Sequence, residues 1–107
     1  MPYGAVPFTR PECAVERTLE VLSNRWTSLI LRELLPGTRR WSELKSVLVG
    51  ISPKTLAERL RILEEQGILT RTVYPEVPPR VEYTLTDKGK SLGPIFEAMR
   101  EWGSRWA

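Results

Sequence analysis

The single cysteine, Cys13, is the side chain best suited to carry out chemistry in this sequence. The 107 residues include no histidine, so the chain has neither an imidazole base nor a histidine metal ligand. One thiol cannot build a metal cluster or close an intrachain disulfide. Because the sequence offers Cys13 no evident base partner, a small thiol enzyme is the weakest of three hypotheses. We expect no enzymatic activity, no bound metal and no cofactor.

Basic side chains gather in one segment of the chain. Residues 39–61 hold six basic and two acidic side chains, a net charge of +4, although the whole chain carries only +3. Residues 1–38 and 91–107 are neutral, and residues 62–90 carry −1. A local excess of cations suits a polyanion such as a nucleic acid, but an ordinary solvated surface would look the same. The structure expected of this segment decides between the two.

The elements that must position these charges are mostly helices. Residues 1–12 contain three prolines and are expected to form an irregular arm. Apolar residues at helical spacing predict a helix from Ala14, and a second one after Asn24, which is a good N-cap. The second helix ends at Pro36-Gly37 and is apolar over so much of its surface that we expect it at the centre of the core.

A helix-turn-helix is expected next. A short segment over 38–41 leads into a two-turn helix over 42–48, and Gly50 follows it. Ser52-Pro53 then gives the strongest helix start in the chain, with a serine N-cap and proline at the first helical position. One face of the new helix carries three leucines: Leu56, Leu60 and Leu63. We expect it to be the recognition helix, over about 52–66.

After Gly67 the apolar period changes from that of a helix to that of a strand. Two β-rich stretches on either side of residues 75–79 predict a hairpin wing over about 68–85, and a last helix follows over about 87–106. The expected fold is mainly α with a small β-hairpin (α+β): a single winged helix-turn-helix domain over 13–107, with terminal helices forming a dimer interface.

Candidate DNA contacts follow from this arrangement, because a helix in the major groove needs donors in its N-terminal half. The candidates in the recognition helix are Ser52, Lys54, Thr55, Arg59 and Arg61. Those outside it are Arg39 and Ser42, near the two-turn helix, and Arg80 in the wing; Arg71, Lys88 and Lys90 are weaker candidates. Each could be an ordinary surface charge, but a position in the second helix of a helix-turn-helix favours DNA.

Several stretches of the chain match a known family in order. They are Cys13 to Leu19, Arg25 to Leu34, Ser42 to Leu44, GISPKTLAERLRILEEQGIL from Gly50 to Leu69, and YPEVPPRVEYTLTDKG from Tyr74 to Gly89. Together they make residues 13–106 resemble the HxlR-type winged-helix transcriptional regulators, relatives of the MarR group. The resemblance implies a homodimer that binds an operator through two recognition helices and two wings.

The resemblance also gives Cys13 a possible role, because some HxlR-type proteins resemble redox or electrophile sensors with a cysteine near this place. The sequence puts Cys13 just before the first helix, with the backbone amides of the helix start and Arg17 one turn on near its thiol. A redox switch at Cys13 is therefore one interpretation. The other is a small, partly buried apolar side chain.

Apolar side chains in the terminal helices predict a second copy of the chain as a partner. The candidates are Val15, Leu19, Leu92, Phe96, Met99, Trp102 and Trp106. A domain of this length cannot bury so many of them in one small core, so exposed indoles imply an interface. The alternative is a last helix packed wholly within its own subunit.

These observations favour a homodimeric, sequence-specific transcriptional regulator, and more specifically a repressor, on a pseudo-palindromic double-stranded DNA operator. An oxidant or small molecule is a possible signal. The alternative is a winged-helix protein-interaction module without DNA binding. The first residues do not resemble a signal peptide and apolar runs are short, so we expect a cytoplasmic protein without a membrane partner.

Overall fold

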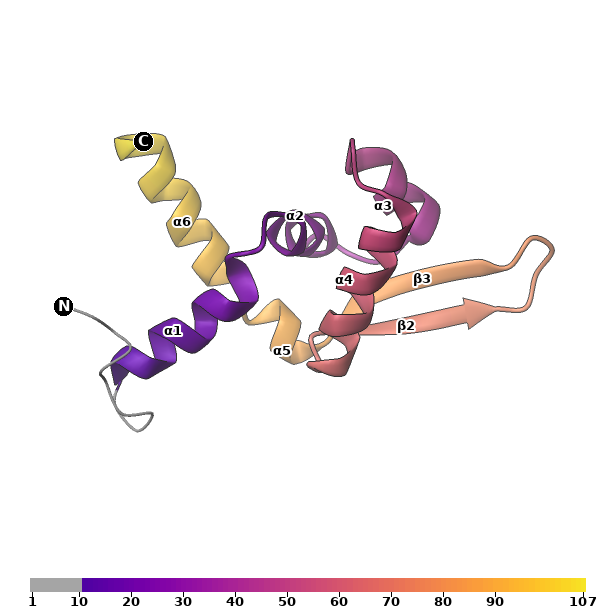
Figure 1. Ribbon diagram of the computed structural model, residues 1–107, viewed down its shortest axis with the longest axis horizontal. Helices are drawn as coiled ribbons and strands as arrows, with labels where there is room; N and C mark the ends of the chain where they lie inside the picture. The colour runs from indigo at the N-terminus through magenta and orange to yellow at the C-terminus, as the bar shows by residue number, and fades with distance from the viewer. Residues whose placement is uncertain (1–10) are drawn as a thin grey trace.

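The computed structural model describes residues 11–107 (Figure 1). The first helix, α1, spans Pro11–Leu22, so it begins three residues before the predicted Ala14 and the expected arm over 1–12 extends too far. Proline is tolerated in the first turn of a helix, where its missing N–H would have no intrahelical partner, and Pro11 therefore starts α1 instead of preventing it. The rest of the arm lies outside the described residues.

The remaining elements follow in the order expected of a winged helix. They are α2 Arg25–Leu34, β1 Arg39–Arg40, α3 Trp41–Val47, α4 Pro53–Glu65, β2 Leu69–Tyr74, β3 Arg80–Leu85, α5 Asp87–Lys90 and α6 Gly93–Trp106. The strands form an antiparallel sheet in the order β1-β3-β2, so the short β1 joins the hairpin at its β3 edge. The predicted fold class, mainly α with a small β-hairpin, is confirmed.

Side-chain caps and two glycines set the ends of the central helices. The Asn24 side chain accepts hydrogen bonds from the backbone N–H groups of Trp26 and Thr27, at 3.0 and 3.2 Å, and so starts α2 as predicted. Gly50 and Gly67 have φ of 91° and 72°, a backbone region that favours glycine. These two residues turn the chain before and after α4.

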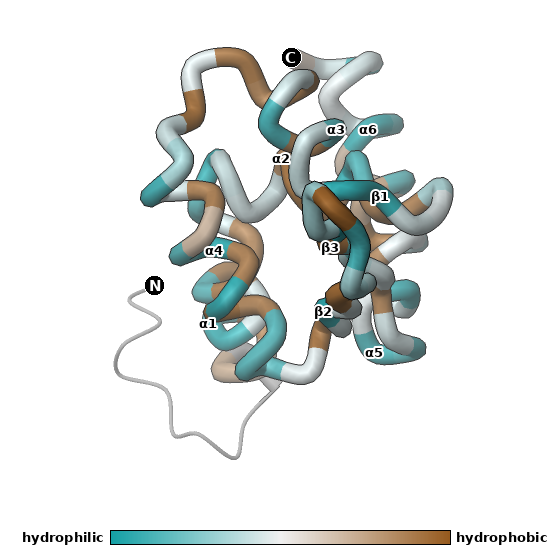
Figure 2. Tube along the Cα trace, turned by 90° about the vertical axis from the view of Figure 1, so that its right-hand side faces the viewer, coloured by the Kyte–Doolittle hydropathy of each residue, from teal (hydrophilic) through white to brown (hydrophobic). Residues whose placement is uncertain are grey.

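The core lies where α2, α4 and the sheet meet. Its fully buried side chains include Ile30, Leu31 and Leu34 from α2 and Leu56, Leu60 and Leu63 from α4. The expectation that α2 is the central helix is therefore confirmed. Hydrophobic and hydrophilic residues alternate along α4 in Figure 2, as they must in a helix with one face in the core.

The single helix expected over 87–106 is wrong, because the structure has two helices there. The short α5 ends at Lys90, and α6 begins at Gly93. Pro94 has no N–H to donate to the carbonyl four residues earlier, and its ring would collide with that carbonyl in a continuous helix. Proline instead occupies the first turn of the new helix α6. Between the two helices, Leu92 packs against the core.

Gly89 offers a test of the packing between α5 and the sheet. A Cβ at this buried glycine would lie 2.2 Å from the carbonyl oxygen of Ile68, which accepts hydrogen bonds from the N–H and hydroxyl of Thr86. We expect Gly89→Ala to lower the free energy of unfolding in urea by about 1–3 kcal/mol. Gly103→Ala in α6 is the matched control, since its Cβ meets nothing within 4 Å. A loss of equal size in both variants would contradict this packing.

Candidate nucleic-acid interface

The candidate interface is built around the first turn of α4. The Ser52 hydroxyl oxygen accepts a hydrogen bond from the N–H of Thr55 at 3.1 Å and lies 2.9 Å from the Thr55 hydroxyl. Pro53 occupies the first helical position. This capped helix end carries a partial positive charge, and Ser52, Pro53 and Lys54 are all exposed around it. An anion can therefore approach the start of α4.

Charges on the outward face of α4 are unevenly balanced along the helix. Lys54, in the first turn, is exposed and forms no ion pair within the described part of the chain. Glu58, one turn on, is exposed and acidic. Arg61 forms an ion pair with Glu65 at 2.6 Å, in which both side chains are about 60% exposed. The uncompensated positive charge of this face is therefore at its N-terminal end.

The two candidates on the flank of α4 are less open. Thr55 and Arg59 are half-buried. The Nε of Arg59 is buried and has no hydrogen-bond partner among the described residues. The apolar stem of an arginine can pack along a helix while its guanidinium tip stays accessible. Arg59 can therefore reach a ligand only with the outer part of its side chain.

The candidates before α4 lie at the junction of β1 and α3. Arg39 is half-buried, and its Nε donates a hydrogen bond to the backbone carbonyl of Glu33 at 3.4 Å, which ties it to the end of α2. The carboxylate of Glu43 accepts from the N–H of Arg40 at 2.8 Å and so holds the start of α3. Ser42 is exposed in the first turn of α3.

Arg80, the predicted wing contact, is held within the hairpin. Its guanidinium lies 3.9 Å from the centroid of the Tyr74 ring. It also forms ion pairs with Glu76 at 3.1 Å and Glu82 at 3.4 Å. Both carboxylates could be seen in the sequence, but their pairing with Arg80 depends on the strand register and the bend of the wing tip. Arg71, on β2, is exposed and has no partner among the described residues.

The apolar side chains expected to form a dimer interface divide into two groups. Leu92 and Phe96 are half-buried against the core. Val15 and Leu19 on α1, and Met99, Trp102 and Trp106 on α6, are half or more exposed, with 68% for Trp106. Ile95 is also exposed on α6, and sequence analysis left it out of the set although its spacing from Met99 is helical. Each of the two terminal helices therefore carries an exposed apolar face.

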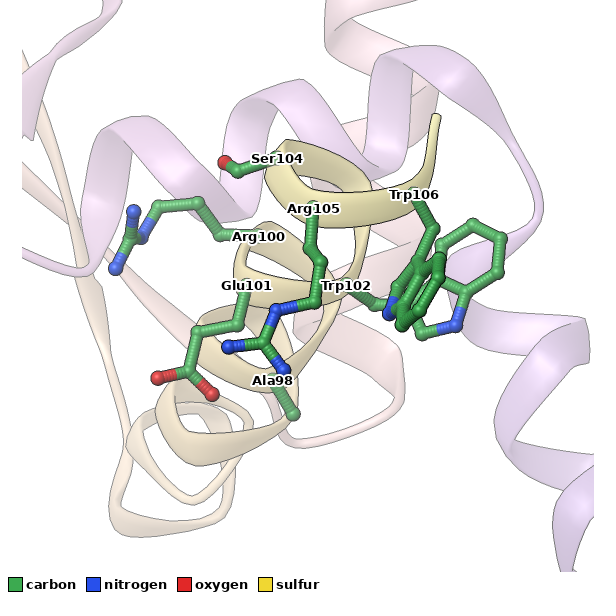
Figure 3. A pocket seen from close by; sticks show the side chains of 7 residues that line it. All are labelled: Ala98, Arg100, Glu101, Trp102, Ser104, Arg105 and Trp106. Carbon is green, nitrogen blue, oxygen red and sulfur yellow. The ribbon is translucent and has the colours of Figure 1, made fainter.

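One side of α6 carries this apolar face and the other side carries charge. Figure 3 shows the indoles of Trp102 and Trp106 next to each other, pointing away from Arg100 and Glu101. The hollow around them is lined only by residues of α6, so no second element encloses it. On the charged side, a hydrogen bond from Arg100 and its positive charge lower the pKa of the Glu97 carboxyl.

Cys13 lies within the first turn of α1, not before it as sequence analysis expected, because α1 begins at Pro11. Its side chain is 3% exposed. Across the described part of the chain, no group of three His, Cys, Asp or Glu side chains could hold a metal ion. No helix over 11–107 is both long enough and apolar enough to cross a membrane.

A capped, cationic helix that follows a short helix and a tight turn, with a hairpin beside it, defines a DNA-binding winged helix-turn-helix domain. Residues 21–107 match the model of the HxlR-like helix-turn-helix family. The chain belongs to this family.

Relatives and solved structures agree with this assignment. An uncharacterised HTH-type transcriptional regulator of Synechocystis sp. is 49% identical over 94 residues, which are 88% of this chain and 70% of the relative. A MarR-family regulator of Porphyromonas gingivalis W83 has a TM-score of 0.84 at 34% identity, covering 95% of this chain and 100% of that one. The oxidised form of the redox regulator HypR has a TM-score of 0.78 at 40% identity, covering 86% of this chain and 95% of that one. The protein is therefore a transcriptional regulator of the helix-turn-helix type.

Proposed function

We propose that the protein is a homodimeric repressor that binds a pseudo-palindromic DNA operator through α4 of each subunit. The observation that carries this proposal is the first turn of α4, where Ser52 caps the helix and Lys54 is exposed without an ion-pair partner among the described residues. Helix N-termini of this kind bind phosphate, and the following residues read base edges in the major groove. Membership of the HxlR-like family supports the same role.

The proposed contacts follow the exposure of each side chain. Lys54 and Arg61, both exposed, reach phosphates or base edges, and Ser52 and Thr55 hold the helix end toward a phosphate. The half-buried Arg59 reaches DNA with the outer part of its side chain. Ser42 and Arg39 contact the DNA sugar-phosphate backbone beside α3. Arg80 orders the wing that lies against the duplex.

A second copy covers the exposed apolar face of α1 and α6 in this proposal. Indoles that are 63% and 68% exposed, at Trp102 and Trp106, are costly on a free surface and typical of interfaces. Two-fold symmetry would place the two α4 helices about 34 Å apart, one turn of DNA. A dimer that occupies its operator in this way blocks transcription most simply by excluding polymerase.

We assign the signal to the Cys13 thiol. Oxidation or attachment of an electrophile adds atoms to a side chain that is 3% exposed, so α1 must move to make room for them. Similarity to HypR, described as a redox regulator, supports a thiol switch. Movement of α1 would disturb the dimer and with it the spacing of the two α4 helices.

A protein-interaction module without DNA binding is the competing function. It is favoured by exposed valines on the surface assigned to DNA, with Val49 84% exposed in the turn before α4 and Val77 fully exposed at the wing tip. Duplex binding at low salt separates the two functions. Footprinting on the DNA next to the gene of this protein would supply the operator.

Replacement of Lys54 tests the DNA interface. We expect Lys54→Ala to weaken binding of the footprinted duplex about tenfold and to make the slope of log K against log salt concentration shallower by about one, because one phosphate contact is lost. Fluorescence anisotropy over a salt series measures both. Arg32→Ala, which removes an exposed basic side chain of α2 that is not among the candidate DNA contacts, is the matched control. Equal binding by the wild type and Lys54→Ala would rule out this contact.

Replacement of Trp102 tests the dimer. A carboxylate in the apolar face cannot be buried without a partner, so we expect Trp102→Glu to sediment as a 12.3 kDa monomer at micromolar concentration and the wild type at twice that mass. Ser104→Glu, on the other side of α6 in Figure 3, should leave the dimer intact. A monomeric wild type, or a dimeric Trp102→Glu, would contradict the proposed interface.

Replacement of Cys13 tests the signal. We expect hydrogen peroxide or an electrophile to weaken operator binding by the wild type at least tenfold and to leave Cys13→Ser unchanged, since no other thiol is present. Cys13→Ala, which places no hydroxyl in the buried site, controls for destabilisation by serine. Equal oxidant sensitivity of the wild type and both variants would remove Cys13 as the switch.

A further inference from the structure

We infer that the groove between α4 and the wing holds one sugar-phosphate backbone of the bound duplex, and that Arg71 is the wing residue that contacts its phosphates. This inference rests on the proposed DNA-binding function and adds a binding site to it. Arg80, the more obvious wing residue in the sequence, is assigned a positioning role within the hairpin.

The groove has a volume of about 540 Å³ and runs between two elements of the winged helix. One wall is the flank of α4, with Ala57, Arg61 and Glu64. The other wall is the hairpin, with Arg71 on β2 and Tyr83 on β3. Arg71 and Tyr83 are opposite each other in the strand register, so both side chains lie on the same face of the sheet. Figure 1 shows α4 crossing beside the base of this hairpin.

The shape of B-DNA requires a sugar-phosphate strand to lie between α4 and the wing. The major and minor grooves of a duplex are separated by one sugar-phosphate strand. If α4 lies in the major groove and the wing reaches the adjacent minor groove, that strand must pass between α4 and the hairpin. The groove is the surface that faces it. Because every phosphate carries a negative charge, the cations in the groove decide how well the strand is held.

The two wing arginines differ in whether nearby carboxylates compensate their charge. Arg80 lies against the Tyr74 ring and pairs with two carboxylates, Glu76 and Glu82, so its charge is more than compensated within the hairpin. Arg71 has no such partner among the described residues and is exposed. A phosphate that approached Arg80 would have to displace carboxylates and would meet their repulsion. Arg71 can bind a phosphate without breaking an existing ion pair.

The remaining charges in the groove limit where the DNA backbone can lie within it. Arg61 is across from Arg71 on the α4 wall, and its surface ion pair with Glu65 is of a kind that contributes little to stability. Glu64, one turn further along α4, places a carboxylate in the same groove. The phosphates are therefore expected between Arg61 and Arg71 and away from the C-terminal end of α4. Removal of the Glu64 charge should strengthen DNA binding.

The test measures the salt dependence of binding to a 30-base-pair duplex that carries the footprinted site, with full-length protein variants. We expect Arg71→Ala to make the log–log slope shallower by about 0.9 and to weaken binding about fivefold to tenfold at about 0.1 M salt. Arg71→Lys keeps the charge and should retain the wild-type slope. Glu64→Gln should bind more tightly than the wild type. Thermal unfolding followed by circular dichroism identifies any variant that fails to fold.

A double variant separates the two wing arginines. Arg80→Gln combined with Glu76→Gln keeps the net charge of the wing and removes both ion pairs of Arg80, so we expect the slope to stay at the wild-type value. A wild-type slope for Arg71→Ala, or a slope that falls by about one in the double variant instead, would overturn the inference. Failure of the wild type itself to bind the duplex at low salt would be a different result, because it would overturn the proposed function as well.

Discussion

The burial of one leucine face of α4 against α2 and the sheet determines everything that this helix presents to a partner. Leu56, Leu60 and Leu63 are 0–2% exposed, and burial of each such side chain contributes about 1.5–3 kcal/mol. Because the helix repeats every 3.6 residues, fixing these three positions also fixes the others. Lys54 and Arg61 must face outward. The surface proposed to bind DNA is thus a consequence of core packing.

The same constraint explains which parts of the fold could be predicted from the sequence. Local signals are strong where one residue has one physical role, as with the Asn24 cap, the Ser52-Pro53 start and the two glycines at positive φ. The break before α6 also had a local signal in Gly93-Pro94, but the apolar period continues across it and hides the break. The arm over 1–12 was extended too far because Pro11 can start a helix as readily as prevent one.

The candidate site was less predictable, because its charges depend on contacts between elements. Sequence position made Arg80 look like a free cation at the wing, whereas the hairpin brings Tyr74, Glu76 and Glu82 around it. Arg39 was likewise placed on the surface by sequence, and its contact with the carbonyl of Glu33 needs the fold of β1 against the end of α2. Segment charge identified residues 39–61 as the basic segment. It could not distinguish which cations in that region are already paired.

In α1, the inward and outward faces connect the proposed signal to the proposed dimer. Cys13 is only 3% exposed, while Val15 and Leu19 are more than half exposed. At 100° per residue these two lie about 200° and 240° from Cys13, on the opposite side of the helix. Because buried sites are close-packed, atoms added at Cys13 would displace the buried side of α1 in the proposed switch, and the exposed side would move with it. In the proposed mechanism, chemistry at the thiol would therefore reach DNA through the dimer interface, which would set the distance between the two α4 helices.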